Sequence, residues 1–138
     1  MAKRMRAFIV AAVIIALRLP AHAEEAAPNG CEPLAEISGQ TLFAENCVFC
    51  HGADGKGGGP LAQAKNLAPP DLTKLAARTN GKFPADHVFD TLRHGAGGQT
   101  GDKAMPAWTK IFAHECGDAY ARRATFELEK YLKTIQEK

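Results

Sequence analysis

Five residues, Cys47-Val48-Phe49-Cys50-His51, set the centre around which this chain must fold. Two cysteines two residues apart, followed directly by histidine, form the C-x-x-C-H pattern that attaches a c-type haem through two thioether bonds. The histidine then stands where it can become an axial ligand of the haem iron. We therefore expect Cys47 and Cys50 to hold a haem covalently and His51 to bind its iron. The sequence contains no second C-x-x-C-H, which predicts one haem per chain.

Two other interpretations of the C-x-x-C spacing fit the chain less well. A structural zinc site needs a second pair of ligands at a compatible spacing, but the two remaining cysteines, Cys31 and Cys116, stand alone and far apart. A thioredoxin-like redox pair needs a βαβ pattern around it. Here a helical pattern precedes the motif and a glycine-rich loop follows it, so haem attachment is the favoured interpretation.

Residues 1–23 have the three parts of a secretory signal peptide. A basic start is followed by an apolar stretch over residues 7–17 and by a small-residue cleavage site that ends at Ala23. The apolar stretch is well short of the roughly 20 residues that a membrane-spanning helix needs, so we expect no membrane anchor in the mature chain. We expect cleavage after Ala23 and a periplasmic product, in agreement with a haem that is attached outside the bacterial cytoplasm.

Removal of residues 1–23 changes the charge of the chain. It takes away four of the 17 basic residues and none of the 15 acidic ones, so the mature chain carries 17 − 4 = 13 basic and 15 acidic side chains, a net charge of −2. No basic stripe remains that would favour nucleic acid or an anionic membrane as partner. The remaining length predicts one monomeric domain over residues 36–138 after a polar lead-in over residues 24–35.

The helical signals along this domain predict an all-α fold. A first helix should begin near Glu36 or Ser38, with Ser38 as its N-cap, and run into the haem motif. A short helix over residues 72–77 should follow Asp71, and another should begin near Pro84 and stop at Gly95. Apolar residues at three- and four-residue steps predict a last helix. Asp118 is the expected N-cap of that helix.

Met105 is the expected second axial ligand, because Met1 and Met5 leave with the signal peptide and Met105 is then the remaining thioether. Pro106 would restrict the loop that holds its sulfur. Trp108 would cover the haem while its N–H finds a polar partner. Three histidines are the alternative ligands, and a bis-histidine iron would have a lower reduction potential. They are His87, His94 and His114.

These residues resemble the class I c-type cytochromes. The matching features are Gly39 and Phe43 before Cys47, Cys50 and His51; Gly59-Pro60; Met105-Pro106-Ala107-Trp108; and Tyr131 and Leu132 in the last helix. The resemblance implies a small cytochrome c fold with helices around one covalent haem c. It also implies that the first and last helices cross, with Gly39 against Leu128 or Tyr131.

Two details of this resemblance are open. The ring N–H of His51 should bond to a backbone carbonyl, because metal-bound histidines generally donate their other ring nitrogen. The resemblance implies the carbonyl of Pro60 as the acceptor, and Pro69 is the alternative. The extra pair Cys31 and Cys116 departs from the simplest members; we expect it to form a disulfide, because the compartment is oxidising, with two free thiols as the alternative.

The expected function is one-electron transfer between redox proteins through a His/Met-ligated iron, which makes the chain an electron carrier and not an enzyme. Its partners should be a donor and an acceptor that dock transiently. Two alternatives are a haem-bearing subunit of a dehydrogenase or oxidase complex, and a haem sensor or peroxidase with an open iron position. Met105 argues against the last of these.

The mature product should span Glu24 to Lys138 and carry one covalent haem. Intact mass and a haem stain on a denaturing gel measure both features. A purified product without covalent haem, or one that retains Met1 to Ala23, would contradict the interpretation.

Overall fold

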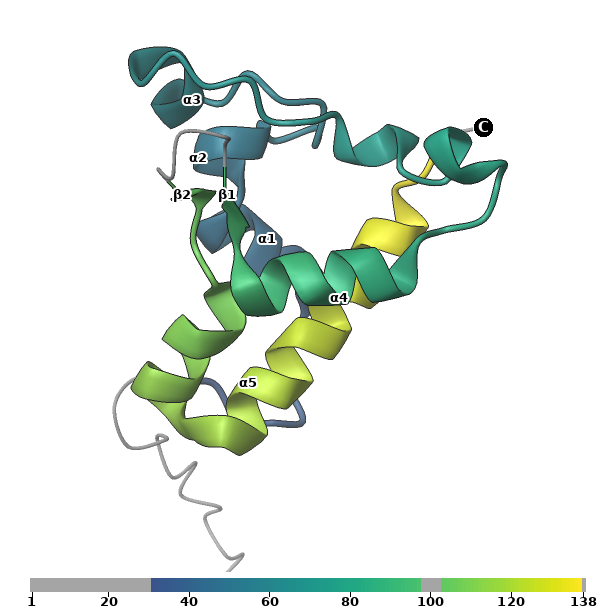
Figure 1. Cartoon of the computed structure of the whole chain (residues 1–138). Helices are drawn as coiled ribbons and strands as arrows, with labels where there is room; N and C mark the ends of the chain where they lie inside the picture. The colour runs from purple at the N-terminus through teal and green to yellow at the C-terminus, as the bar shows by residue number, and fades with distance from the viewer. Residues whose placement is uncertain (1–30, 98–102, 138) are drawn as a thin grey trace, which may run out of the picture.

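The computed structural model describes residues 31–97 and 103–137, so the expected signal peptide and most of the polar lead-in lie outside the described residues. Figure 1 shows the arrangement of the elements. In chain order they are α1 (Gly39–Asn46), α2 (Val48–His51), α3 (Pro60–Ala64), the 3₁₀ turns η1 (Leu72–Lys74) and η2 (Ala77–Thr79), α4 (Ala85–His94), β1 (Ala96–Gly97), β2 (Lys103–Met105) and α5 (Trp108–Thr134). The fold is all-α, as the sequence predicts, with one short antiparallel pair of strands, β1 and β2, in the described part.

The first helix, α1, begins directly after its predicted N-cap, Ser38. Ser38 has an extended backbone and its side-chain oxygen accepts from the backbone N–H of Thr41 at 3.5 Å, which satisfies one of the free donors at the helix start. The chain turns at Cys47 and continues directly into α2, which ends at Gly52 with φ 76°. The predicted run of helix into the haem motif is confirmed.

The segment between the motif and α4 is less regular than expected. Instead of one helix over residues 72–77, it forms the two turns η1 and η2. Asp71 caps the first of them, because its side chain accepts from the backbone N–H of Thr73 at 2.8 Å. This is the local side-chain bond that lets aspartate start a turn and compete with a longer helix.

The helix α4 ends before Gly95, as predicted, and starts one residue later than expected. Pro84 is the N-cap and not the first helical residue. Gly95 follows the last turn with φ 77°, a conformation that side chains other than glycine adopt at a cost. The chain then enters β1, whose Ala96 pairs with Met105 of β2.

The last helix differs most from the prediction. α5 begins at Trp108 and is kinked at Gly117, whose backbone angles, φ 83° and ψ 167°, are not helical. The prediction that Asp118 is the N-cap of the last helix is therefore wrong. The kink falls on the neighbouring glycine, where a positive φ costs least. Residues 108–116 form a helical segment that the polar residues His114 and Glu115 hid from the sequence pattern.

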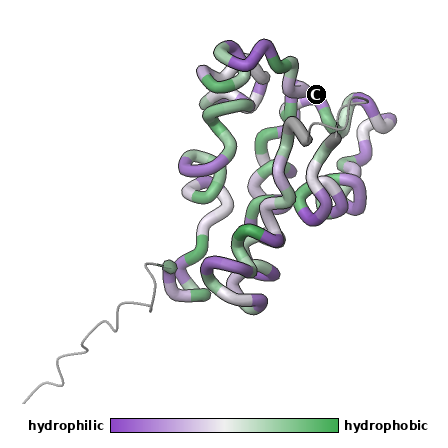
Figure 2. Tube along the Cα trace, turned by 60° about the vertical axis from the view of Figure 1, so that its left-hand side comes forward, coloured by the Kyte–Doolittle hydropathy of each residue, from purple (hydrophilic) through white to green (hydrophobic). Residues whose placement is uncertain are grey.

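The core forms where α1 and α4 pack against α5. Gly39 allows the crossing of α1 and α5, because a Cβ atom there would overlap the backbone oxygen of Glu127 and lie 2.8 Å from the Cβ of Tyr131. Beside the crossing, the rings of Phe43 and Tyr131 lie 5.4 Å apart between centroids. The predicted crossing at Gly39 is confirmed. Figure 2 shows hydrophilic and hydrophobic residues alternating along the helical tubes, as expected for helices with one buried face.

A disulfide joins Cys31 to Cys116, with 5.9 Å between the two Cα atoms. It ties the segment before α1 to the residue before the kink of α5, so the predicted pairing is confirmed. Within residues 31–97 and 103–137, no helix is both long and apolar enough to cross a membrane.

Replacing Gly39 with alanine should separate α1 from α5. Because the new methyl group meets backbone and not a movable side-chain end, the free energy of unfolding should fall by about 3 kcal/mol. Denaturant unfolding measures the change, and the exposed neighbour Gln40 supplies the control. Gln40→Ala should change stability by less than about 0.5 kcal/mol. Equal stability of the two variants would show that the crossing is not tight.

Candidate haem site

One helical turn brings the residues of the C-x-x-C-H motif together. The backbone N–H groups of Cys50 and His51 both donate to the carbonyl of Cys47, at 3.1 and 2.9 Å. Residues three and four positions apart lie on one face of a helix, so Cys47, Cys50 and His51 share a face. Two thiols and an imidazole on one face are the arrangement that a flat cofactor needs if it is to be bonded at its edge and ligated at its centre.

The two thiols of the motif are free, whereas Cys31 and Cys116 are bonded to each other. Burial, and then the neighbouring Cys50, raises the pKa of the Cys47 thiol to about 12. Redox-active C-x-x-C pairs have the opposite property, a cysteine whose pKa is lowered. The pair is therefore unlike a thioredoxin site, and the disulfide removes the other two cysteines from any zinc site.

The imidazole of His51 is buried, with 7% of its residue surface exposed. Burial lowers its pKa, and the backbone carbonyl of Pro70 opposes that shift. Its Nδ1 atom is buried and has no hydrogen-bond partner among the described residues. A buried, unpartnered ring nitrogen in this motif fits a histidine whose place is determined by a bound group, because buried polar atoms in folded proteins otherwise have partners.

The expected hydrogen bond of the His51 ring to Pro60 or Pro69 is not formed among the described residues, because Nδ1 has no partner there. Its acceptor therefore stays a prediction. Pro60 is the first residue of α3. The carbonyl oxygen of Pro69 lies 2.9 Å from where a Cβ of Gly57 would stand. The backbone N–H of Gly57 donates to the carbonyl of His51 at 2.7 Å, so this proline lies beside the loop that follows the motif.

Met105 ends β2 and is half-buried against the cluster of core residues that contains Cys47. Its backbone is fixed by close packing, since a Cβ on Gly95 would stand 2.5 Å from the carbonyl oxygen of Met105. Trp108 begins α5 three residues later, and its ring lies 5.7 Å from that of Phe112. The structure thus places Met105 and Trp108 on adjoining, well-packed parts of the chain.

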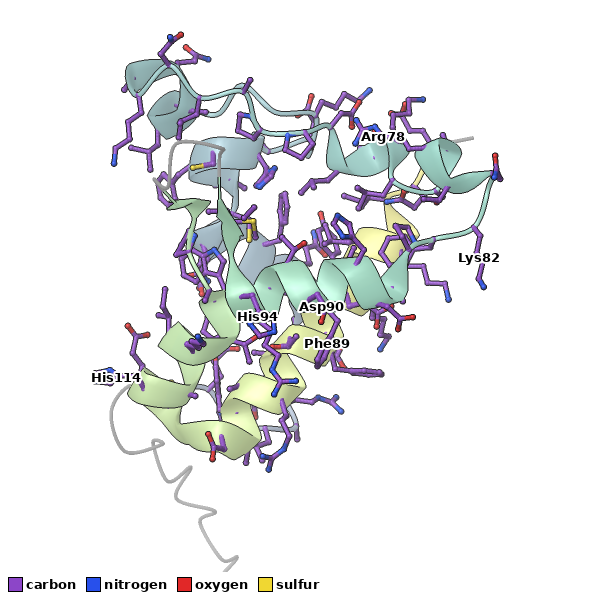
Figure 3. The ribbon with its side chains drawn as sticks, in the orientation of Figure 1. Arg78, Lys82, Phe89, Asp90, His94 and His114 are labelled. Carbon is purple, nitrogen blue, oxygen red and sulfur yellow. A yellow bond between two sulfur atoms is a disulfide. The ribbon has the colours of Figure 1, made fainter. Side chains whose placement is uncertain are left out.

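The alternative histidine ligands lie on the surface. His87, His94 and His114 are all exposed. In Figure 3 the labelled side chains of His94 and His114 project outward, and Phe89 and Asp90 share the outer side of α4 with His94. None of the three is held in the core as His51 is.

The chain around the motif is closely packed and partly apolar at its surface. A Cβ on Gly59 would stand 2.5 Å from the carbonyl oxygen of Phe49, so this glycine lets the loop return against α2. The side chains of Phe49 and Leu61 are exposed. Sequence reasoning named Gly59 only as a matching feature of the family, because only the folded chain shows which glycine meets another backbone.

Comparison with known families agrees with this geometry. Residues 35–124 match the family described as cytochrome C oxidase, cbb3-type, subunit III. The chain belongs to this family. Its domain is a class I c-type cytochrome, as the sequence predicts, and the family implies a covalently bound haem c and a role in electron transfer. The chain has no significant match among curated proteins or solved structures.

The residues present fit the haem that the family implies. Cys47 and Cys50 would hold it, because both thiols are free and lie on one face of the helical turn that Cys47 begins. His51 would face the iron from the same turn. The buried, unpartnered Nδ1 atom of His51 and the two free thiols are the observations on which this fit rests.

Gly95→Ala should loosen the Met105 segment, because its methyl group would press on the carbonyl of Met105. Gly81 is a matched control, since it also has a positive φ of 83° but nothing within 4 Å of its Cβ position. The free energy of unfolding should fall by about 2 kcal/mol more in Gly95→Ala than in Gly81→Ala. Denaturant unfolding and amide exchange across the Ala96–Met105 pair measure the difference. Equal effects of the two variants would show that Gly95 matters only for its backbone angle.

Proposed function

We propose that this protein is a periplasmic single-haem electron carrier, exported by residues 1–23 and cleaved after Ala23, whose iron is ligated by His51 and Met105. The observation that supports it best is the helical turn that gathers Cys47, Cys50 and the buried His51. Two free thiols beside a buried imidazole suit covalent haem, and the family is one of c-type cytochromes. Its partners are redox proteins that bind transiently.

The protein's own residues have three tasks in this proposal. A bound haem supplies the one-electron chemistry. The thiols of Cys47 and Cys50 prevent its loss, His51 presents its ring from a buried position, and Met105 presents a thioether from a backbone fixed by Gly95. Ligands on both sides leave no open position for a substrate, which favours a carrier over a sensor or peroxidase.

A stable subunit of an oxidase complex is the second candidate. The family's description names a subunit of cytochrome c oxidase, which favours it. Two large apolar side chains, Phe89 on α4 and Phe126 on α5, are also exposed, at 40% and 51% of their surface. Gentle purification from membranes distinguishes the candidates, because a subunit stays with its complex whereas a carrier is released with the periplasmic fraction.

Replacing Met105 should change the ligation of the iron and leave the pigment attached. Met105→Ala opens the sixth position, so the reduction potential should fall and carbon monoxide should bind the reduced protein readily. Met105→His keeps the iron six-coordinate but should also lower the potential, because a thioether favours ferrous iron more than imidazole does. Potentiometric titration and the sulfur-to-iron charge-transfer band measure these changes.

Replacement of the alternative ligands provides the control for this test. His87→Ala, His94→Ala and His114→Ala should each keep the potential and the charge-transfer band of the wild type. If instead both Met105 variants kept them and one histidine variant lost them, Met105 would be a core residue and that histidine the ligand.

A further inference from the structure

A cavity of about 440 Å³ lies where the second half of α1 meets the first part of α5. Its volume is within the range of roughly 300–1,000 Å³ that is typical of small-molecule sites. The residues that shape it most are Leu42, Glu45 and Asn46 of α1 and Phe112, Glu115 and Tyr120 of α5. The cysteines and the histidine of the haem motif do not line it, and neither does Met105, so the cavity is separate from the haem site.

The floor of this cavity is apolar and held in place. Leu42, Phe112 and Tyr120 are buried, and the two aromatic rings lie 6.1 Å apart between centroids in an edge-on arrangement. The disulfide between Cys31 and Cys116 also lines the cavity and ties the segment before α1 to α5. Walls that are fixed by a core and by a covalent bond lose little freedom when a ligand binds, which favours binding.

The polar groups around this floor are mostly hydrogen-bond acceptors. The carboxylates of Glu45 and Glu115 line the cavity, and neither forms a salt bridge within the described part of the chain. The side-chain nitrogen of Asn46 donates to the carbonyl of Leu42 at 2.9 Å, so its oxygen is the polar atom left for a ligand. His114 also lines the cavity but projects outward in Figure 3, at the rim. Two unpaired carboxylates and an amide oxygen over an apolar floor suit a positively charged donor.

Tyr120 gives an independent indication of a ligand. Only 9% of its residue surface is exposed, and its hydroxyl makes no hydrogen bond among the described residues. A buried tyrosine usually has a partner for its hydroxyl. Burial, and then the carboxylates of Glu32, Glu45 and Glu115, raise the pKa of Tyr120, so the hydroxyl stays neutral and can accept a hydrogen bond from a cation.

We propose that this cavity binds an organic cation, a guanidinium, amidinium or ammonium group on an apolar stem. The charged end lies between Glu45 and Glu115 and donates to the hydroxyl of Tyr120. The stem rests on Leu42 and Phe112. A metal ion fits the cavity less well, because the described residues include no group of three His, Cys, Asp or Glu side chains that could hold one. The inference goes beyond the proposed function and does not depend on it, because no haem-binding residue takes part.

Benzamidine and benzamide test the proposal, because the two molecules have the same shape and only benzamidine carries a charge. In an NMR titration of the reduced holoprotein, benzamidine should shift the amide signals of residues 42–46 and 112–120 and reach saturation. It should bind about tenfold more tightly than benzamide, because hydrogen bonds to charged groups are the stronger ones. A capped tripeptide with a central arginine distinguishes the source of the cation. Tighter binding than benzamidine favours an arginine side chain of a partner protein, and weaker binding favours a free small molecule.

Variants of the cavity test the role of each group. Glu45→Gln combined with Glu115→Gln should weaken benzamidine binding about tenfold, because an exposed ion pair contributes up to about fivefold. Glu129→Gln removes a charge elsewhere on α5 and should leave the dissociation constant unchanged. Tyr120→Phe should weaken binding about threefold without lowering the free energy of unfolding, because its hydroxyl makes no hydrogen bond within the described part of the protein.

Three results would overturn the inference. The first is benzamide that binds as tightly as benzamidine, which would show that the cavity does not select for charge. The second is a Glu129→Gln protein that loses as much affinity as the double variant, which would make the effect one of net charge. The third is a Tyr120→Phe protein that binds benzamidine as the wild type does. A failure of the proposed function is distinct from these, because the wild type itself would then lack covalent haem or the sulfur-to-iron band.

Discussion

The close crossing of α1 and α5 at Gly39 is the contact on which the rest of the structure depends. It exists because position 39 has no side chain, so the helix backbones approach until a Cβ would overlap the carbonyl of Glu127. The haem motif begins immediately after α1, so its position relative to α5 is set by this contact. Burial of Phe43 and Leu128 beside the crossing then supplies the hydrophobic free energy that keeps the two helices together.

The helix α5 connects this crossing to both ends of the fold. Near its kink, the disulfide between Cys31 and Cys116 fixes the segment before α1. At its other end, Gln136 and Glu137 bind the turn that follows Pro70. The helix α5 and the residues that follow it therefore reach the start of the domain, the helix before the haem motif and the turn η1. In the proposed function these contacts would hold the haem motif in place, because the redox chemistry itself belongs to the cofactor.

Features that depend on a few neighbouring residues were predictable from the sequence. Ser38 caps α1 because its hydroxyl reaches a nearby N–H, and Gly95 ends α4 because it tolerates a positive φ. The all-α class and the haem motif also follow from short patterns, whereas the crossing at Gly39 was implied by the resemblance to class I c-type cytochromes. The signal peptide and the ligation by Met105 remain predictions, the former because residues 1–23 lie outside the described part of the chain.

Other features were not predictable from the local pattern. The kink falls on Gly117 and not on Asp118, and nothing in the local pattern distinguishes a capping aspartate from a surface one. The bonds of Gln136 join it to Ala76 and Leu72, which are 60 and 64 positions away in sequence. A single glutamine gives no sequence signal of such contacts.

X-ray absorption at the iron edge of the purified holoprotein tests the central claim most directly. The account predicts a sulfur atom in the coordination shell of the iron, together with the porphyrin nitrogens and one imidazole nitrogen, in both oxidation states. A shell of nitrogen alone, or one with an open position or a water oxygen in place of sulfur, would contradict it.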